Sequence, residues 1–196
     1  MSKQNKKVKI QTLALGAMFT ALVIMLQMFG QFIRFGTFQT SLVLVPIIIG
    51  AALCGSKMGA WLGFAFGLVV LLNGDALLFL NWNVVGTIVT VLLKGTLCGF
   101  VAGLVYNLIE KHNKHLAAFA TAVVCPIVNT GVFVLGCYAF FYNDIAKFAL
   151  ENGLGNATNA IFIGFAGGNF IFELILNLIL TPVIIIVLKS VKGLRV

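Results

Sequence analysis

Residues 10–33 of the chain, IQTLALGAMFTALVIMLQMFGQFI, form a continuous apolar run without a charged side chain. A bilayer core of about 30 Å needs about 20 apolar residues in an α-helix, which rises about 1.5 Å per residue. The run is too long for the apolar part of a secretory signal peptide, and it has no small-residue cleavage site. It therefore predicts a retained first transmembrane helix.

The composition of the whole chain agrees with this prediction. Its 196 residues are 61% hydrophobic and 9% charged, with a mean hydropathy of +1.10. A soluble domain is about 45–50% apolar and about 25% charged. The shortage of charge excludes a nucleic-acid-binding module, an extracellular disulfide scaffold and a disordered tail, because each needs polar surface. We interpret residues 1–196 as a single transmembrane domain of an integral membrane protein.

Further apolar runs follow along the chain and predict a compact all-α bundle of six transmembrane helices. Two of these runs are short for spans, and a re-entrant or strongly tilted hairpin is the alternative for that pair. The runs are Ser41–Cys54, Met58–Leu72, Asn83–Leu108, Leu116–Phe141 and Ile161–Leu188, of which the first two are the short ones.

The basic residues are divided unequally between the two sides of this six-span arrangement. Cytoplasmic loops of membrane proteins collect Lys and Arg. One side holds Arg34 and Lys147, and Lys94 lies inside a span. This bias predicts cytoplasmic termini, a basic cytoplasmic leader over residues 1–9 and an extracellular loop over residues 142–160. The other side, predicted to be cytoplasmic, holds Lys3, Lys6, Lys7, Lys9, Lys57, Lys111, Lys114, Lys189, Lys192 and Arg195.

Two charged residues lie deep inside predicted spans. Counted from the outer ends of their helices, Lys94 lies about 15 Å and Glu173 about 18 Å into the membrane, near its midplane. An unpaired ion at that depth costs at least about 2.5–3.5 kcal/mol on insertion scales. We therefore expect the two side chains to pair with each other or to bind a polar ligand. A purely structural ion pair between the fourth and sixth spans is the alternative.

Other polar and aromatic residues complete a predicted substrate-binding site. Asn129 and Asn169 lie within spans, where buried amides bind ligands or hold helices together. Aromatic side chains near the outer helix ends would line the mouth of a cavity or form an interfacial belt. The predicted substrate-binding residues are Arg34, Trp82, Asn83, Lys94, Asn129, Tyr138, Asn169 and Glu173.

Small residues recur every four positions in several spans. Helices in lipid approach one another closely at such ladders. Glycine ladders in the third span (59, 63, 67) and the fourth span (95, 99, 103) are typical of internal packing. Ala17 and Ala21 lie instead in the cytoplasmic half of the first span, beside the basic leader, where a second membrane protein could dock.

Motifs of the common catalytic and metal sites are missing from the chain. It has no phosphate-binding GxxxxGK[ST] loop, no HExxH and no GxSxG. His112 and His115 fall in a predicted cytoplasmic loop, and the cysteines form no CxxC pair. We therefore expect no enzymatic activity, no metal and no cofactor. If the protein transports a solute, the energy must come from another subunit.

The sequence resembles the substrate-binding S components of energy-coupling factor (ECF) transporters. The resemblance rests on a basic leader, the segment LALGAMFTAL (13–22), a short glycine-rich pair of spans and the segment VNTG (128–131). It implies a six-helix protein that captures a vitamin from outside the cell and associates with a membrane T component and two ATPase subunits. It also implies that Ala17 and Ala21 pack against the T component.

The identity of the vitamin is indicated by a second stretch. The segment FQTSLVLVP (38–46) makes the sequence most similar to pantothenate-type members. Arg34, Lys94 or Lys147 could neutralise a carboxylate, and Asn129 and Asn169 suit hydroxyl and amide groups. Riboflavin, folate and a pyrimidine remain alternatives. A membrane scaffold or assembly subunit without a ligand is the competing function, and a membrane-embedded transferase ranks below it.

Overall fold

The computed structural model of the chain describes residues 3–30, 34–35, 38–39 and 42–193. The regular secondary structure of this part is helical apart from two short antiparallel strands, β1 (Arg34–Phe35) and β2 (Phe38–Gln39), in which Arg34 pairs with Gln39. The α-helices are α1 (Lys3–Gly30), α2 (Leu44–Cys54), α3 (Ser56–Leu72), α4 (Leu77–Trp82), α5 (Val84–Ile109), α6 (Lys114–Gly136), α7 (Tyr142–Glu151), α8 (Ala157–Asn159) and α9 (Gly168–Gly193), and the π-helices are η1 (Cys137–Phe141) and η2 (Ala160–Gly167).

Over the residues that the structure describes, each predicted apolar run corresponds to a helix or to consecutive helices. Four stretches are long and apolar enough to cross a membrane: Ile10–Gly30, Val84–Ile109, Lys114–Glu151 and Ala157–Val191. α2 and α3 are apolar but shorter, with 11 and 17 residues. At about 1.5 Å per residue they measure roughly 16 and 26 Å. The all-α architecture is therefore confirmed, and the count of six crossings stays a prediction.

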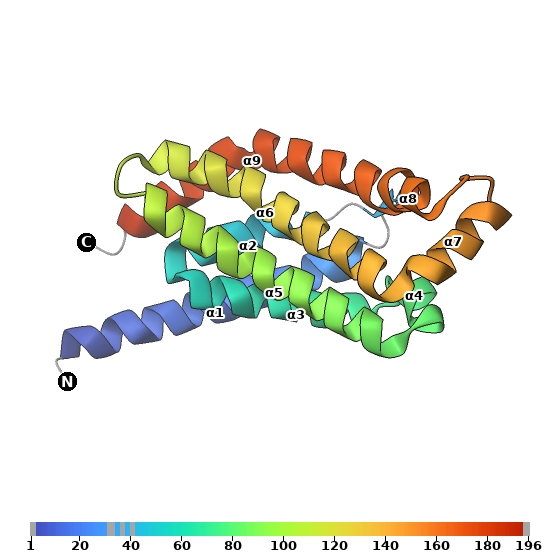
Figure 1. Cartoon of the computed structure of the whole chain (residues 1–196). Helices are drawn as coiled ribbons and strands as arrows, with labels where there is room; N and C mark the ends of the chain where they lie inside the picture. Colours follow the sequence, from blue (N-terminus) through green and yellow to red (C-terminus); the bar gives the residue numbers. More distant parts are fainter. Residues whose placement is uncertain (1–2, 31–33, 36–37, 40–41, 194–196) are drawn as a thin grey trace.

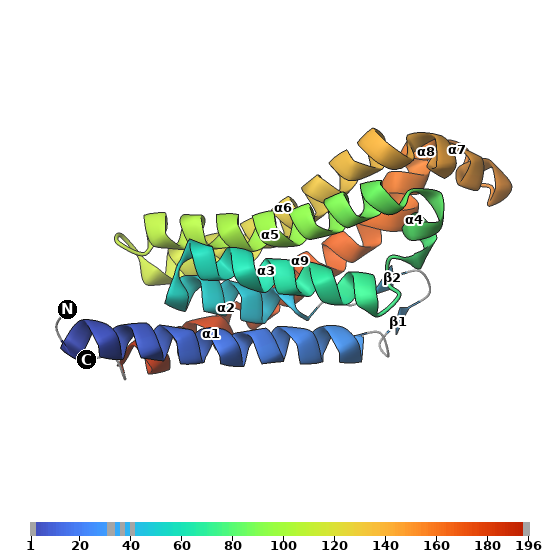
Figure 2. The ribbon, with the colours of Figure 1, turned by 90° about the horizontal axis from the view of Figure 1, so that it is seen from below.

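The long helices run roughly along one axis, and the two ends of the bundle differ (Figure 1). Both chain termini and the α5–α6 connection lie at one end, the terminal end. α4, α7 and α8 lie at the other, the α4 end, and Figure 2 shows the two strands there as well. Lys111 lies in the α5–α6 connection and Lys114 begins α6. Lys111 and Lys114, which are predicted to lie on the cytoplasmic side, are thus both found at the terminal end.

α2 lies at the centre of the bundle, in contact with α1, α3, α5, α6 and α9. Its buried residues are found on every side of the helix, among them Leu44, Ile47 and Ile49. A helix that is apolar all round is typical of a fully enclosed position. Gly55, with φ of +91°, reverses the chain between α2 and α3, a backbone conformation that favours glycine.

The predicted glycine ladders form the contact between α3 and α5, which we name the glycine seam. A Cβ atom added at Gly63 would overlap the carbonyl oxygen of Gly95, and one added at Gly59 would overlap that of Gly99. The two backbones therefore touch directly, as small residues allow between helices in lipid. The prediction that these ladders serve internal packing is confirmed.

The segment over residues 142–160, predicted to be an extracellular loop, is largely helical. It contains α7, a turn with Gly153 and Gly155 at positive φ, and α8. α7 forms because Ile145 and Ala149, four residues apart, are both buried on one face. The many polar residues of this segment concealed the apolar stripe of α7 in the sequence, and the position of the segment outside the cell stays a prediction.

Candidate ligand-binding cavity

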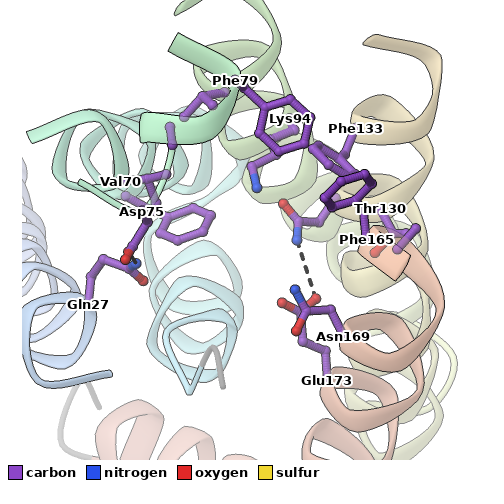
Figure 3. A pocket seen from close by; sticks show the side chains of 15 residues that line it. Gln27, Val70, Asp75, Phe79, Lys94, Thr130, Phe133, Phe165, Asn169 and Glu173 are labelled. Carbon is purple, nitrogen blue, oxygen red and sulfur yellow. Dashed lines mark hydrogen bonds between the residues drawn. The ribbon is translucent and has the colours of Figure 1, made fainter. Parts of the chain in front are cut away.

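A cavity of about 140 Å³ lies inside the bundle, beside α4 (Figure 3). Its volume is far above the roughly 10–15 Å³ that one water molecule requires. It is lined by side chains from helices that are distant in sequence. They are Gln27, Phe66, Val70, Asp75, Ala76, Phe79, Val91, Lys94, Asn129, Thr130, Phe133, Phe165, Ala166, Asn169 and Glu173.

One wall of the cavity consists of polar side chains from α6 and α9. Glu173 and Asn129 are 4% and 5% exposed, and Asn129 Nδ2 donates a hydrogen bond of 3.3 Å to Glu173 Oε2, drawn dashed in Figure 3. Asn169 precedes Glu173 by four residues and lies on the same face of α9. Asn129 Oδ1 is buried and accepts no hydrogen bond from the described residues. An unsatisfied oxygen of this kind costs about 1–3 kcal/mol unless a ligand or water supplies a donor.

Lys94 extends from α5 into the space between the walls (Figure 3). Its Nζ lies 5.8 Å from the centre of the Phe66 ring and 5.3 Å from that of Phe133. Cation–π attraction of this kind stabilises an ammonium by about 0.5–2 kcal/mol. Glu173 adds a longer-range electrostatic attraction. Within the described residues the ammonium contacts these rings and makes no hydrogen bond, so its donors are available to a ligand.

The opposite wall joins α1 to the turn between α3 and α4. Gln27 is 5% exposed, and its Nε2 donates to Asp75 Oδ2 at 2.7 Å. Asn73 Nδ2 donates to the same oxygen at 2.7 Å, and the Asp75 backbone N–H donates to Asn73 Oδ1 at 3.1 Å. The Asp75 carboxylate is therefore fixed to its own turn and to α1 at once. Figure 3 shows Gln27 and Asp75 on the far side of Lys94 from Asn169 and Glu173.

Aromatic rings cover the cavity at the α4 end. Phe79 of α4 meets four other rings edge-on, with centroid separations of 5.2–5.5 Å. Such edge-to-face pairs are worth about 0.5–1.5 kcal/mol beyond their buried area. The four rings are those of Trp82, Phe133, Phe141 and Phe165. We name Phe79 and these partners the aromatic roof; it contributes three of the cavity-lining residues.

The structure brings half of the predicted substrate-binding residues together. Lys94, Asn129, Asn169 and Glu173 all line the cavity. Trp82 does not line it directly, but its ring packs on Phe79 and so belongs to the aromatic roof. The residues that meet are those predicted from isolated polar side chains deep inside apolar spans.

The other predicted residues lie elsewhere. Asn83 caps α5, where its Oδ1 accepts a hydrogen bond of 2.9 Å from the backbone N–H of Gly86. The Tyr138 ring stacks on Tyr142, and Tyr138 is 41% exposed and does not line the cavity. Arg34 belongs to β1, and its side chain lies outside the part of the structure that is described.

The sequence prediction missed several lining residues. Gln27 was visible as a polar residue in the first span, and Thr130 as the neighbour of Asn129. Asp75 follows Asn73 and Gly74 in the polar stretch after the third predicted span, and it is not among the predicted site residues. Phe79 belongs to α4, whose apolar residues (76–80) are too few for a span and were not among the predicted runs.

The predicted docking residues Ala17 and Ala21 are exposed on α1. α1 lies along one side of the bundle (Figure 2). Its inner face contains the buried residues Val23 and Gln27. The exposed face can therefore contact lipid or another protein.

Comparison with known proteins identifies the chain at the level of the family. Residues 11–185 match the family described as "ECF transporter, substrate-specific component". The chain belongs to this family. This S component is 28% identical over 207 residues to the "Pantothenic acid transporter PanT" of Lactococcus lactis subsp. cremoris (strain MG1363), an alignment that covers 96% of the chain and 98% of that protein. No solved structure shows a significant match.

Family membership decides several of the expectations from the sequence. The protein is a transporter subunit and not an enzyme, and it is a multi-pass protein of the cell membrane. S components work together with the T component and ATPases of the ECF module. Within the described residues no group of three or more His, Cys, Asp or Glu side chains could hold a metal ion.

Proposed function

We propose that the protein binds pantothenate from outside the cell and delivers it inward as the S component of an ECF transporter. The observation that carries the proposal is that one cavity holds a lysine ammonium and a buried amide oxygen, neither of which has a hydrogen-bond partner among the described residues. These are Lys94 and Asn129 Oδ1. Both are accounted for when a ligand supplies an anionic group and a hydrogen-bond donor.

The chemistry of pantothenate matches these two groups. The molecule has a carboxylate at one end, an amide in the middle and two hydroxyl groups at the other. Lys94 would bind the carboxylate, Asn129 Oδ1 would accept from an amide or hydroxyl group, and Glu173 and Asp75 would accept from hydroxyls. The similarity to PanT, whose printed name refers to pantothenic acid, supports the same assignment.

The size of the cavity favours a small ligand. Its volume of about 140 Å³ is below the roughly 300–1,000 Å³ of pockets for drug-sized molecules. A compact chain such as pantothenate suits this space better than the fused rings of riboflavin or folate. Trp82 and the other members of the aromatic roof would cover the ligand. Arg34, Asn83 and Tyr138 would contact it on its way in, nearer the mouth of the cavity.

We propose six crossings, with the terminal end in the cytoplasm and the α4 end outside. The basic residues at the terminal end support this orientation. The central, fully enclosed position of α2 supports its participation in the bundle as a crossing together with α3. Ala17 and Ala21, exposed on α1, would dock the T component.

A ligand-free membrane scaffold is the competing function, and it predicts that the polar residues around Lys94 and Asn129 satisfy one another and leave no cavity. Mass spectrometry of small molecules that remain with the purified protein tests between the two. We expect pantothenate to co-purify and, after its removal, to bind again in isothermal titration calorimetry. If no pantothenate co-purifies and added pantothenate does not bind, the proposal is rejected.

A further inference from the structure

Side-chain hydrogen bonds join α1 to its neighbours at different distances from the cavity. Gln27 Nε2 donates to Asp75 Oδ2 at 2.7 Å, and both residues line the cavity. Trp61 Nε1 donates to Thr20 Oγ1 at 3.2 Å, and neither of these residues lines it. A ligand that fills the cavity therefore touches the attachment at Asp75 and not the one at Thr20.

The attachment at Asp75 is also the more strongly built of the two. The Gln27 side chain is 5% exposed, and the Asp75 carboxylate is held in addition by Asn73. Hydrogen bonds to a charged group in a place with little water are stronger than those between neutral, exposed groups. Trp61, by contrast, is 53% exposed and donates to a neutral hydroxyl.

α1 is one continuous helix from Lys3 to Gly30. Gln27 follows Ala21 by six residues and Ala17 by ten, which places them about 9 and 15 Å apart along the axis. The alanines are exposed, whereas Gln27 is buried. A displacement of the Gln27 end is transmitted along the helix, because packed helices move as rigid bodies.

We propose that Gln27 and Asp75 are positioning residues that couple occupation of the cavity to docking of the T component on α1. The inference rests on the proposed function, because it takes pantothenate as the ligand and Ala17 and Ala21 as the docking residues. A ligand hydroxyl that shares the Asp75 carboxylate with Gln27 alters how firmly the outer half of α1 is held. Because such coupling is reciprocal, docking of the module changes the affinity for the ligand by the same factor.

The experiment measures how strongly the S component in nanodiscs binds the purified ECF module, with and without saturating pantothenate. The ratio of the two affinities is the readout, since a merely structural role would change both affinities alike. For the unmodified protein we expect a ratio that differs from one by about fivefold or more. In Gln27→Leu and in the shape-conserving variant Asp75→Asn the ratio should fall below about twofold.

Trp61→Phe is the matched control, because it removes the hydrogen bond to Thr20 of α1 without touching the cavity. Its ratio should equal that of the unmodified protein. Thermal midpoints of all variants show whether each remains folded, and Asp75→Asn decides the question if Gln27→Leu does not fold.

Three results would reject the inference, and only one of them would also reject the proposed function. An unchanged ratio in Asp75→Asn overturns the role of the pair. A ratio of one in unmodified protein that does bind pantothenate overturns the coupling and leaves the proposed function intact. Failure of the isolated, unmodified protein to bind pantothenate rejects the proposed function and this inference together.

Discussion

α5 takes part in two regions that are packed in opposite ways. Toward α3, Gly95 meets Gly63 at backbone contact, with no space for a methyl group. Its chain neighbour Lys94 reaches into a cavity of about 140 Å³, where no residue of the described structure donates a hydrogen bond to Asn129 Oδ1. Under-satisfied polar groups persist only where the surrounding structure holds them in place. The glycine seam therefore holds α5 rigidly against α3. This rigidity keeps Lys94, on the same helix, in position in the cavity.

The largest effect is expected from breaking the glycine seam. In Gly63→Ala the new methyl group would overlap the carbonyl oxygen of Gly95, and a backbone atom cannot move aside as a side chain can. We expect a loss of stability of about 1–3 kcal/mol, measured as a lower thermal midpoint in detergent.

The matched control for the seam is Gly131→Ala in α6. A Cβ at Gly131 has no neighbouring atom within 4 Å, so this variant should keep or slightly raise the midpoint, because alanine favours the helix. Equal midpoints for Gly63→Ala and Gly131→Ala would show that the close approach of α3 and α5 does not contribute to stability.

The second largest effect is expected at Lys94. Lys94→Met keeps an apolar stem against Phe66 and Phe133 but removes the charge. A hydrogen bond to a charged group contributes about 1.5–3 kcal/mol, so pantothenate affinity should fall roughly 10- to 150-fold. Panthenol, in which an alcohol replaces the carboxylate, should lose less than about threefold in the same titration. Similar losses for both compounds would assign Lys94 to structure and not to the carboxylate.

Asn129 should show a smaller effect that does not depend on ligand charge. Asn129→Ala removes a neutral acceptor whose contribution is about 0.5–1.5 kcal/mol, which is about 2- to 13-fold in affinity. Pantothenate and panthenol should weaken alike, because both keep the amide and hydroxyl donors. If panthenol binding were untouched while pantothenate binding fell, Asn129 would act on the carboxylate region instead.

The cavity was predictable where a polar residue stood alone in an apolar span. A polar side chain in a membrane span carries a desolvation penalty that only polar partners in the protein or a ligand can offset. Such a residue is visible in the sequence without tertiary information, as is the case for Lys94, Asn129, Asn169 and Glu173. Helix positions followed from the apolar runs for the same reason. The seam was also predictable, because its spacing is local to each helix.

The rest of the site depends on contacts that no local pattern contains. Gln27 and Asp75 are 48 residues apart and meet only after α1 packs against the α3–α4 turn. Asp75 lies in a polar turn, where a carboxylate is common and does not indicate a binding site. Trp82 and Tyr138 have the same interfacial character in the sequence. In the structure, however, Trp82 packs against Phe79, whereas Tyr138 stacks on Tyr142 and does not line the cavity.

The smallest effect is expected at Thr90, which separates two explanations of an unsatisfied oxygen. Thr90 is 3% exposed, and its Oγ1, like Asn129 Oδ1, has no hydrogen-bond partner among the described residues, but Thr90 does not line the cavity. Valine has the same shape without the hydroxyl, and removing an unpaired buried polar group is neutral or stabilising. Thr90→Val should therefore leave pantothenate affinity within about twofold and raise stability by up to about 1 kcal/mol, as measured by calorimetry and thermal melting. If Thr90→Val weakened binding as much as Asn129→Ala does, an unpaired oxygen in this bundle would not indicate a ligand contact. The proposed binding site would then rest on Lys94 and not on Asn129.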